Sequence, residues 1–182
     1  AKDAEMVPVV EGGTQSLFLV RQTEHAMWMA LVEENPQNIR RAPPSVRADY
    51  EVVLNAVQRD GNMLQFASPA LKSDHTIAMA AVRQNGLAVL CLPGRLRADR
   101  TIASAAVQQE GLALDYLPRF QADHDLVLAA VQQNWRALEF ASPDLREEDV
   151  GVCWAAVQQS QEAQRYVLGR AHTECERLLA IG

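Results

Sequence analysis

Apolar residues recur along this chain with helical spacing and with a period of about 25 residues. Each unit carries an apolar pattern at positions i, i+1, i+4 and i+5, as in Val52, Val53, Ala56 and Val57, which is typical of a helix with one buried face. The last position of this pattern is a valine in every unit, and these valines lie 25, 25, 25, 24 and 26 residues apart: Val32, Val57, Val82, Val107, Val131 and Val157. The pattern therefore predicts a tandem array of one helical unit.

An acidic residue stands at a fixed place before each apolar pattern. It lies eight residues before each valine, at Glu24, Asp49, Asp74, Asp99, Asp123 and Asp149. A carboxylate at this place can accept hydrogen bonds from the free N–H groups of the first helical turn. We therefore expect these acids to be N-caps and the repeats to start near residues 24, 49, 74, 99, 123 and 149.

The second half of each unit is shorter. The pairs Asp60-Gly61, Asn85-Gly86 and Glu110-Gly111 predict that the first helix ends at a glycine, which tolerates the left-handed conformation. A second apolar stretch follows, such as Met63-Leu64-x-Phe66, and prolines close it at Pro69, Pro93, Pro118 and Pro143. Each unit is thus predicted to be a helix of about 10 residues, a glycine turn, a helix of about six residues and a proline loop.

Such a unit cannot bury its apolar face alone, whereas stacked neighbours bury it together. The predicted fold class is all-α, with tandem helical hairpins that form a short right-handed α-solenoid. We expect one continuous domain in three parts. Residues 1–23 would be an N-terminal cap or degenerate half-repeat, residues 24–168 an array of about six repeats, and residues 169–182 a C-terminal capping helix.

Composition narrows the class of protein. The 182 residues are 48% hydrophobic and 22% charged, which excludes a disordered chain. The net charge of −6 argues against a phosphate-binding surface as the main role. The three cysteines are far apart and fit no disulfide framework, and no apolar run is long enough to span a bilayer. The chain opens AKDAEM without an initiator methionine, which we interpret as a piece of a longer protein or a processed start.

The run LAAVQQNWRALEFASPDLREED, residues 128–149, closely resembles a bacterial and protist repeat family of unknown function, whose approximate consensus is V-x-A-A-V-x-x-N-G-x-A-L-x-[YF]-A-S-x-x-L-[RK]-x-D. The resemblance covers residues 49–149 well and residues 24–48 and 150–168 loosely. Trp135 in place of glycine and Cys91 in place of the aromatic residue depart from the consensus. The resemblance implies no catalytic residues. It implies a module of a larger bacterial protein, either cytoplasmic or secreted into a host cell as part of an effector.

Three histidines follow the expected capping acid directly, at His25, His75 and His124. One interpretation is a row of carboxylate–imidazole pairs that binds a metal or transfers a proton. The other is that first-turn positions face solvent and accept any polar residue. We favour the second and expect no metal site, because pairs in alternate units would lie roughly 18 Å apart, too far to share one ion.

Three further features carry competing interpretations. The linker cations Arg47, Lys72, Arg97 and Arg146 would form a stripe that meets phosphates or acidic peptide, or would pair with nearby caps, as Arg97 with Asp99; the overall acidity favours pairing. The glutamine pairs, such as Gln108-Gln109, would form a ladder that reads a partner or, as we favour, only solvate the helix. Trp135 would be an exposed binding hot spot or would fold back over the short helix.

No P-loop, dinucleotide fingerprint, nucleophile elbow or zinc cluster stands in the sequence, so we expect neither an enzyme nor a cofactor. The leading hypothesis is a scaffold that presents an extended surface to a protein or peptide partner, with no membrane association. The expected binding residues are Trp135, Arg47, Lys72, Arg97, Arg146, His75 and His124. A nucleic-acid-binding helical repeat, which the net charge makes a poor fit, and a structural spacer arm are the alternatives.

Overall fold

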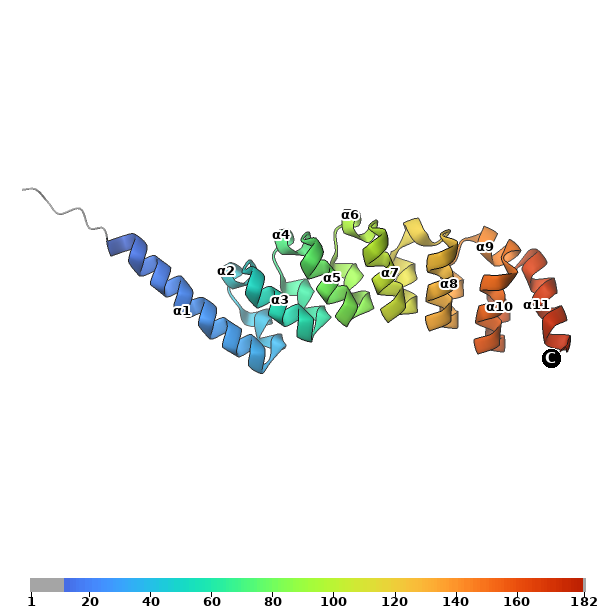
Figure 1. Ribbon diagram of the computed structural model, residues 1–182, viewed down its shortest axis with the longest axis horizontal. Helices are drawn as coiled ribbons and strands as arrows, with labels where there is room; N and C mark the ends of the chain where they lie inside the picture. The colour runs from blue at the N-terminus through green and yellow to red at the C-terminus, as the bar shows by residue number, and fades with distance from the viewer. Residues whose placement is uncertain (1–11, 182) are drawn as a thin grey trace, which may run out of the picture.

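The computed structural model describes residues 12–181, with side chains described from residue 22 onward. Its elements form a row of similar units between two longer terminal helices, α1 (Gly12–Glu34) and α11 (Gly169–Ile181), which lie at opposite ends of the array (Figure 1). No strand occurs within these described residues. The predicted all-α solenoid of tandem repeats is therefore confirmed, while its handedness stays a prediction.

Each unit begins with a ten-residue α-helix, and these long helices lie side by side along the array (Figure 1). They are α3 (Tyr50–Arg59), α5 (His75–Gln84), α7 (Arg100–Gln109), α8 (His124–Gln133) and α10 (Val150–Gln159). The expected acids cap all five, because Asp49, Asp74, Asp99, Asp123 and Asp149 each accept a hydrogen bond from a backbone N–H two or three residues ahead. Glu24 is the exception, because it lies inside α1 and caps nothing.

The second element of each unit is a six-residue 3-10 helix and not a turn of α-helix. These helices are η1 (Pro36–Arg41), η2 (Gly61–Phe66), η3 (Gly86–Cys91), η4 (Gly111–Tyr116), η6 (Trp135–Phe140) and η7 (Gln161–Tyr166). The residue between the two helices ends one and caps the other: Asn85 has a φ of −146°, and its side chain accepts a hydrogen bond from Leu87 N–H. The same geometry recurs at Asp60 and Asn134.

The proline loops contain a third short element. Four are single α-helical turns or little more, namely α2 (Pro44–Arg47), α4 (Pro69–Lys72), α6 (Gly94–Arg97) and α9 (Pro143–Glu148), and the fourth unit has the 3-10 turn η5 (Pro118–Phe120) instead. Most of these prolines open the short element at its first position, where a missing N–H costs nothing. Proline therefore not only follows the end of one helix, as predicted, but also begins the next short element.

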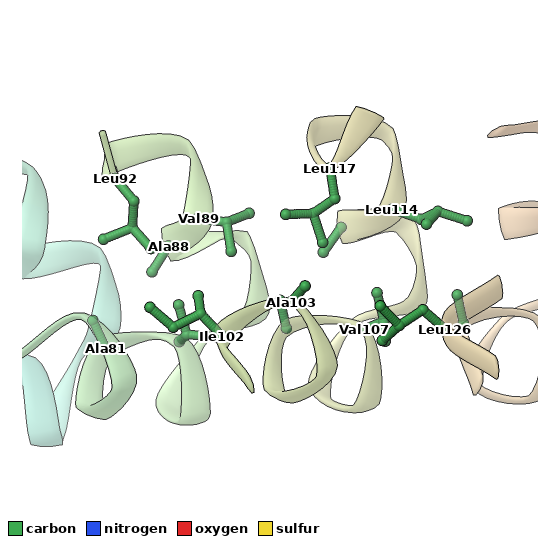
Figure 2. Packing of buried hydrophobic residues seen from close by; sticks show 14 of the residues in the cluster. Ala81, Ala88, Val89, Leu92, Ile102, Ala103, Val107, Leu114, Leu117 and Leu126 are labelled. Atoms are coloured by element: carbon green, nitrogen blue, oxygen red, sulfur yellow. The ribbon is translucent and has the colours of Figure 1, made fainter. Parts of the chain in front are cut away.

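The core lies between two layers, with the long helices on one side and the 3-10 helices on the other (Figure 2). Ile102, Ala103 and Val107 of α7 point into the space between the layers, where Val89, Leu114 and Leu117 lie on the opposite side, and all six are fully buried. Burying one such aliphatic side chain contributes roughly 1.5–3 kcal/mol, and every unit supplies several of them. The core runs continuously from Val32 to Cys175.

The array ends where the capping aspartate is missing. At the C-terminal side the short element and the following long helix merge into α11, which starts at Gly169. At the N-terminal side α1 runs without a break through residue 23. Residues 1–11 of the expected N-terminal cap, and residue 182, lie outside the described residues, and the division at residues 23 and 168 stays a prediction.

The repeated glycines permit a close approach between units. None has a left-handed backbone, because among the described residues only Gly169 has a positive φ. A Cβ atom on Gly61, Gly86 or Gly111 would instead lie 2.4, 2.6 or 2.4 Å from a carbonyl oxygen of the next unit's long helix. The predicted left-handed glycine turn is therefore wrong, and the glycines are required by packing between neighbouring units.

The substitution Gly86→Ala tests this requirement. We expect it to lower the free energy of unfolding by about 1–3 kcal/mol, because the new Cβ meets the Ala106 carbonyl oxygen, which belongs to a rigid helix. Gly94→Ala is the matched control, since no atom lies within 4 Å of its Cβ position and its φ is not positive. The control should be neutral or stabilising by roughly 0.4–1 kcal/mol. Equal losses in urea denaturation of the two variants would contradict the packing explanation.

Candidate interaction surfaces

A glutamine at the end of four of the five long helices, α5, α7, α8 and α10, binds the preceding unit. The N–H groups of Gly61, Gly86 and Gly111 donate to the Oε1 atoms of Gln84, Gln109 and Gln133, over 2.6, 2.6 and 2.7 Å. The Nε2 atoms of the same glutamines donate to the carbonyl of the last residue of the preceding long helix, as from Gln109 to Gln84 over 3.4 Å. We call this arrangement the glutamine clamp.

The glutamine clamp changes the interpretation of the glutamine pairs. The second glutamine of each pair joins neighbouring units, and the first, such as Gln108, is exposed. The expected solvating role therefore describes only the first. The second glutamines form the ladder of the other interpretation, and its hydrogen bonds go to the backbone of the neighbouring unit.

In four of the six units, the residue that follows the repeated acid also joins two units. His25 Nδ1 lies 2.8 Å from Asp49 Oδ2, and His75 Nε2 lies 3.6 Å from Asp99 Oδ2. His124 Nε2 and Arg100 contact the next caps in the same way, Asp149 at 3.1 Å and Asp123. Each imidazole therefore pairs with the capping aspartate of the following unit and not with the acid of its own unit. The position after the acid thus makes a structural contact between units.

The imidazole–carboxylate pairs do not gather into a metal site. Within residues 12–181 no three His, Cys, Asp or Glu side chains are placed so that they could hold an ion. Hydrogen bonding to Asp49 raises the pKa of His25 against the opposing effect of burial, and the nearby charges of Asp49 and Glu51 raise it further. The hydroxyl of Thr101 donates to Asp99 and is the largest cause of the lowered pKa of that carboxyl.

The linker cations Arg47, Lys72 and Arg97 end α2, α4 and α6, and Arg146 lies in α9; these short elements share one edge of the array (Figure 1). None of the four cations forms an ion pair with any residue that the structure describes, so the favoured pairing, as of Arg97 with Asp99, does not occur. The Nε atoms of the three arginines are buried without a hydrogen-bond partner in the same part of the chain. The cations therefore form the row of the other interpretation, and binding of a ligand by it stays a prediction.

Trp135 begins η6 at the position where other units have glycine. Its ring is half-buried and lies 6.3 Å from the ring of Tyr166, which belongs to the next unit. The guanidinium carbons of Arg136 and Arg165 lie 5.0 and 5.7 Å from the centre of the Trp135 ring. The Trp135 side chain is thus half-buried, and its ring lies beside the following unit.

A groove of about 650 Å³ opens on the outer face of α5 and α7. It is lined by Met79 and Arg83 of α5 and by Arg100, Thr101, Ser104, Ala105, Gln108 and Gln109 of α7. It exists because Ser104 is small, whereas the same position of the neighbouring long helices holds Leu54, Met79, Leu128 or Trp154. Its volume falls within the range of small-ligand and side-chain pockets.

The charge of this groove opposes that of the chain. Arg83 and Arg100 line it and no carboxylate does, although the net charge is −6. Arg100 is engaged with Asp123 and Asp125, while Arg83 is exposed and pairs with no carboxylate among the described residues. This groove was not predicted from the sequence. Its sign in the sequence is Ser104, a small residue at a helix position where the other long helices carry large residues.

The cysteines and the helices add no further site. All three cysteines are free, and burial raises the pKa of the Cys153 thiol to about 12, which leaves it unreactive. Cys91 is half-buried in the slot that other units fill with an aromatic ring. Within the described part of the chain, no helix combines the length and the apolar character needed to cross a bilayer.

Comparison with known families agrees with the repeat. The family described as "Domain of unknown function (DUF4116)" matches the chain four times in overlapping tandem, over residues 27–72, 49–97, 74–121 and 99–146. Each match spans two successive units, from one long helix to the end of the next unit. No curated protein and no solved structure is significantly similar to the chain.

The His25–Asp49 pair makes stability depend on pH. Because the folded pKa of His25 is raised, its contribution is fully present below the unfolded value and is lost as the pH rises through the folded value. We therefore expect the difference in Tm between wild type and His25→Gln to be larger at about pH 6 than at about pH 8. A difference that is constant or grows with pH would show that the pair does not stabilise the protonated form.

Proposed function

Because the chain belongs to the DUF4116 family, a domain of unknown function, we propose its function from the geometry of its surface. It is a non-catalytic scaffold that binds a segment of a protein partner on the outer face of its long helices. The observation that carries this proposal is the groove that Ser104 opens between α5 and α7.

The partner segment is acidic. Arg83 provides a cation without a carboxylate partner in the described part of the chain, and Arg100 adds positive charge beside it. Met79 and Ala105 are half-buried and give the groove an apolar floor. An apolar side chain next to a carboxylate would fit both features, since apolar contact supplies affinity and the charge steers and orients the partner.

The shape of the scaffold supports an extended occupant. The long helices lie side by side with a similar half-buried position on each outer face, and the groove hollows this face between α5 and α7 at Ser104. A partner that crosses the helices would therefore meet a ridged surface with a hollow at this position. Such a pocket is a natural anchor for a single side chain, around which weaker contacts are made.

The substitution Ser104→Leu tests the proposal without disturbing the repeat, because α3 and α8 carry leucine at the same position. Random peptides displayed on phage would be selected on the wild-type chain. We expect the selected peptides to be rich in acidic and apolar residues and to bind Ser104→Leu and Arg83→Gln at least tenfold more weakly, about 1.4 kcal/mol or more, in fluorescence anisotropy.

The matched control is Leu128→Met, which exchanges the same position of α8 for the residue that α5 carries. It should leave binding and thermal stability unchanged. Selected peptides that bind Ser104→Leu as well as wild type would overturn the proposal. The proposal would also be overturned if no peptide binds, while single-stranded RNA binds the wild-type chain at low salt and does not bind Ser104→Leu. The partner would then be a nucleic acid.

A further inference from the structure

The junction between the fifth and sixth units departs from the three junctions that begin with glycine. Glycine is needed at the start of the 3-10 helices because a Cβ atom there meets the next unit, and Trp135 necessarily carries one. The hydrogen bond from the residue 135 N–H to Gln159 Oε1 is 3.2 Å long, against 2.6–2.7 Å at the three glycine junctions. The Gln159 Nε2 atom reaches back to the Val131 carbonyl instead of the last residue of α8.

Trp135 packs partly against the core, but its side chain is not needed for the clamp, which forms with glycine at three other junctions. The tryptophan stays half-buried. A large aromatic residue that replaces glycine at a junction and stays partly exposed is expected where its ring is used at the surface.

Two arginines surround the same ring. The position of Arg136 holds Gln37, Asn62, Leu87, Leu112 or Glu162 in other units, so Arg136 is a departure from the repeat. The position of Arg165 holds Gln65, Leu90, Asp115 or Glu139, but also Arg40 in the first unit, whose guanidinium carbon lies 5.5 Å from the centre of the Phe66 ring. Arg165 lies 4.8 Å from the centre of the Tyr166 ring as well as near Trp135. Both arginines are exposed, and neither forms an ion pair with the residues that the structure describes.

We propose that Trp135, Arg136, Arg165 and Tyr166, here called the arginine–aromatic cluster, bind an oxyanion carried by an acidic or phosphorylated side chain of a protein partner. A guanidinium that packs over an aromatic ring keeps its N–H edges free for bidentate contact with a carboxylate or a phosphate. Two such groups beside one ring hold the oxyanion from two sides, and the exposed parts of the rings cover the neighbouring apolar atoms of the partner.

The geometry disfavours a nucleobase as the ligand. The rings of Trp135 and Tyr166 are inclined by 37°, so they form no parallel slot into which a flat base could stack. The cluster lies on the 3-10 layer at η6 and η7, whereas the groove lies on the long helices α5 and α7. The two surfaces belong to different layers and different units, so this inference stands independently of the proposed function.

The experiment uses three fluorescein-labelled eight-residue peptides: oligoglutamate, oligoglutamine, and a serine–glycine peptide with phosphoserine at alternate positions. Binding is followed in ¹H–¹⁵N spectra through the tryptophan indole resonances, with that of Trp135 assigned by Trp135→Phe. We expect at least one anionic peptide to shift the Trp135 indole while oligoglutamine does not, and the stronger of the two identifies carboxylate or phosphate as the oxyanion.

The double variant Arg136→Asn, Arg165→Gln carries the residues of the second unit at both positions and should fold as wild type. It should bind the anionic peptide at least tenfold more weakly. Trp135→Gly should abolish the binding. It should also shorten the hydrogen bond from the residue 135 N–H to Gln159, which would be seen as slower amide exchange at residue 135. A tryptophan with a merely structural role would not combine this effect with lost binding.

Ser104→Leu separates this site from the groove, because it should leave the anionic peptide bound and the Trp135 shift intact. Three results would overturn the inference: an unmoved Trp135 indole with both anionic peptides, equal binding by the double variant, or loss of the shift in Ser104→Leu. Failure of the groove experiment with an intact Trp135 shift would overturn the proposed function alone.

Discussion

The backbone N–H of the glycine that starts η2, η3 and η4 determines how these units of the array stack. The glycine is buried, and the glutamine of the next unit accepts its hydrogen bond. A buried N–H that is left unpaired costs about 1–3 kcal/mol, so the glutamine cannot be lost without a penalty. The glycine must lack a side chain for the glutamine and the next helix to come close enough. The two residues therefore require each other across every regular junction.

This constraint explains both the regularity of the array and the meaning of its exceptions. Where glycine and glutamine are both present, the long helices stack closely and the aliphatic core continues unbroken between them. The capping aspartates add a second contact at the other end of the long helices, through His25, His75, Arg100 and His124. Residues that make these two contacts are explained by folding. The side chains of Ser104 and of the arginine–aromatic cluster make neither contact, which is why both proposals rest on them.

Much of the fold was predictable because its signals are local. The valine period, the capping aspartates and the buried face of each long helix depend only on neighbours within a few residues. The 3-10 form of the second helix was missed, because six residues between a cap and a proline are too few for their apolar pattern to separate 3-10 from α geometry. The glycine was assigned the wrong role, because its usual reason at a helix end is a left-handed backbone and here the reason lies in the next unit.

The candidate site was predicted less well, because its contacts join residues more than 20 positions apart. The histidines were expected only to face solvent, whereas they pair with carboxylates of the following unit. The constant separation of Gly61 from Gln84 and of Gly86 from Gln109, 23 residues in both cases, was a usable sign of the clamp. Trp135 was identified as a departure, while Arg136, Arg165 and Tyr166 became meaningful only when the structure placed them around its ring.

The stability of Gln109→Ala, compared with that of Gln108→Ala, tests the central claim most directly. These neighbours have the same chemistry and are both exposed, but Gln109 accepts the Gly86 N–H whereas Gln108 contacts only Ser104, within its own helix. The account predicts that Gln109→Ala lowers the free energy of unfolding in urea by about 1–3 kcal/mol and speeds amide exchange at Gly86, while Gln108→Ala stays within about 0.5 kcal/mol of wild type. Equal, small losses for both variants would contradict it.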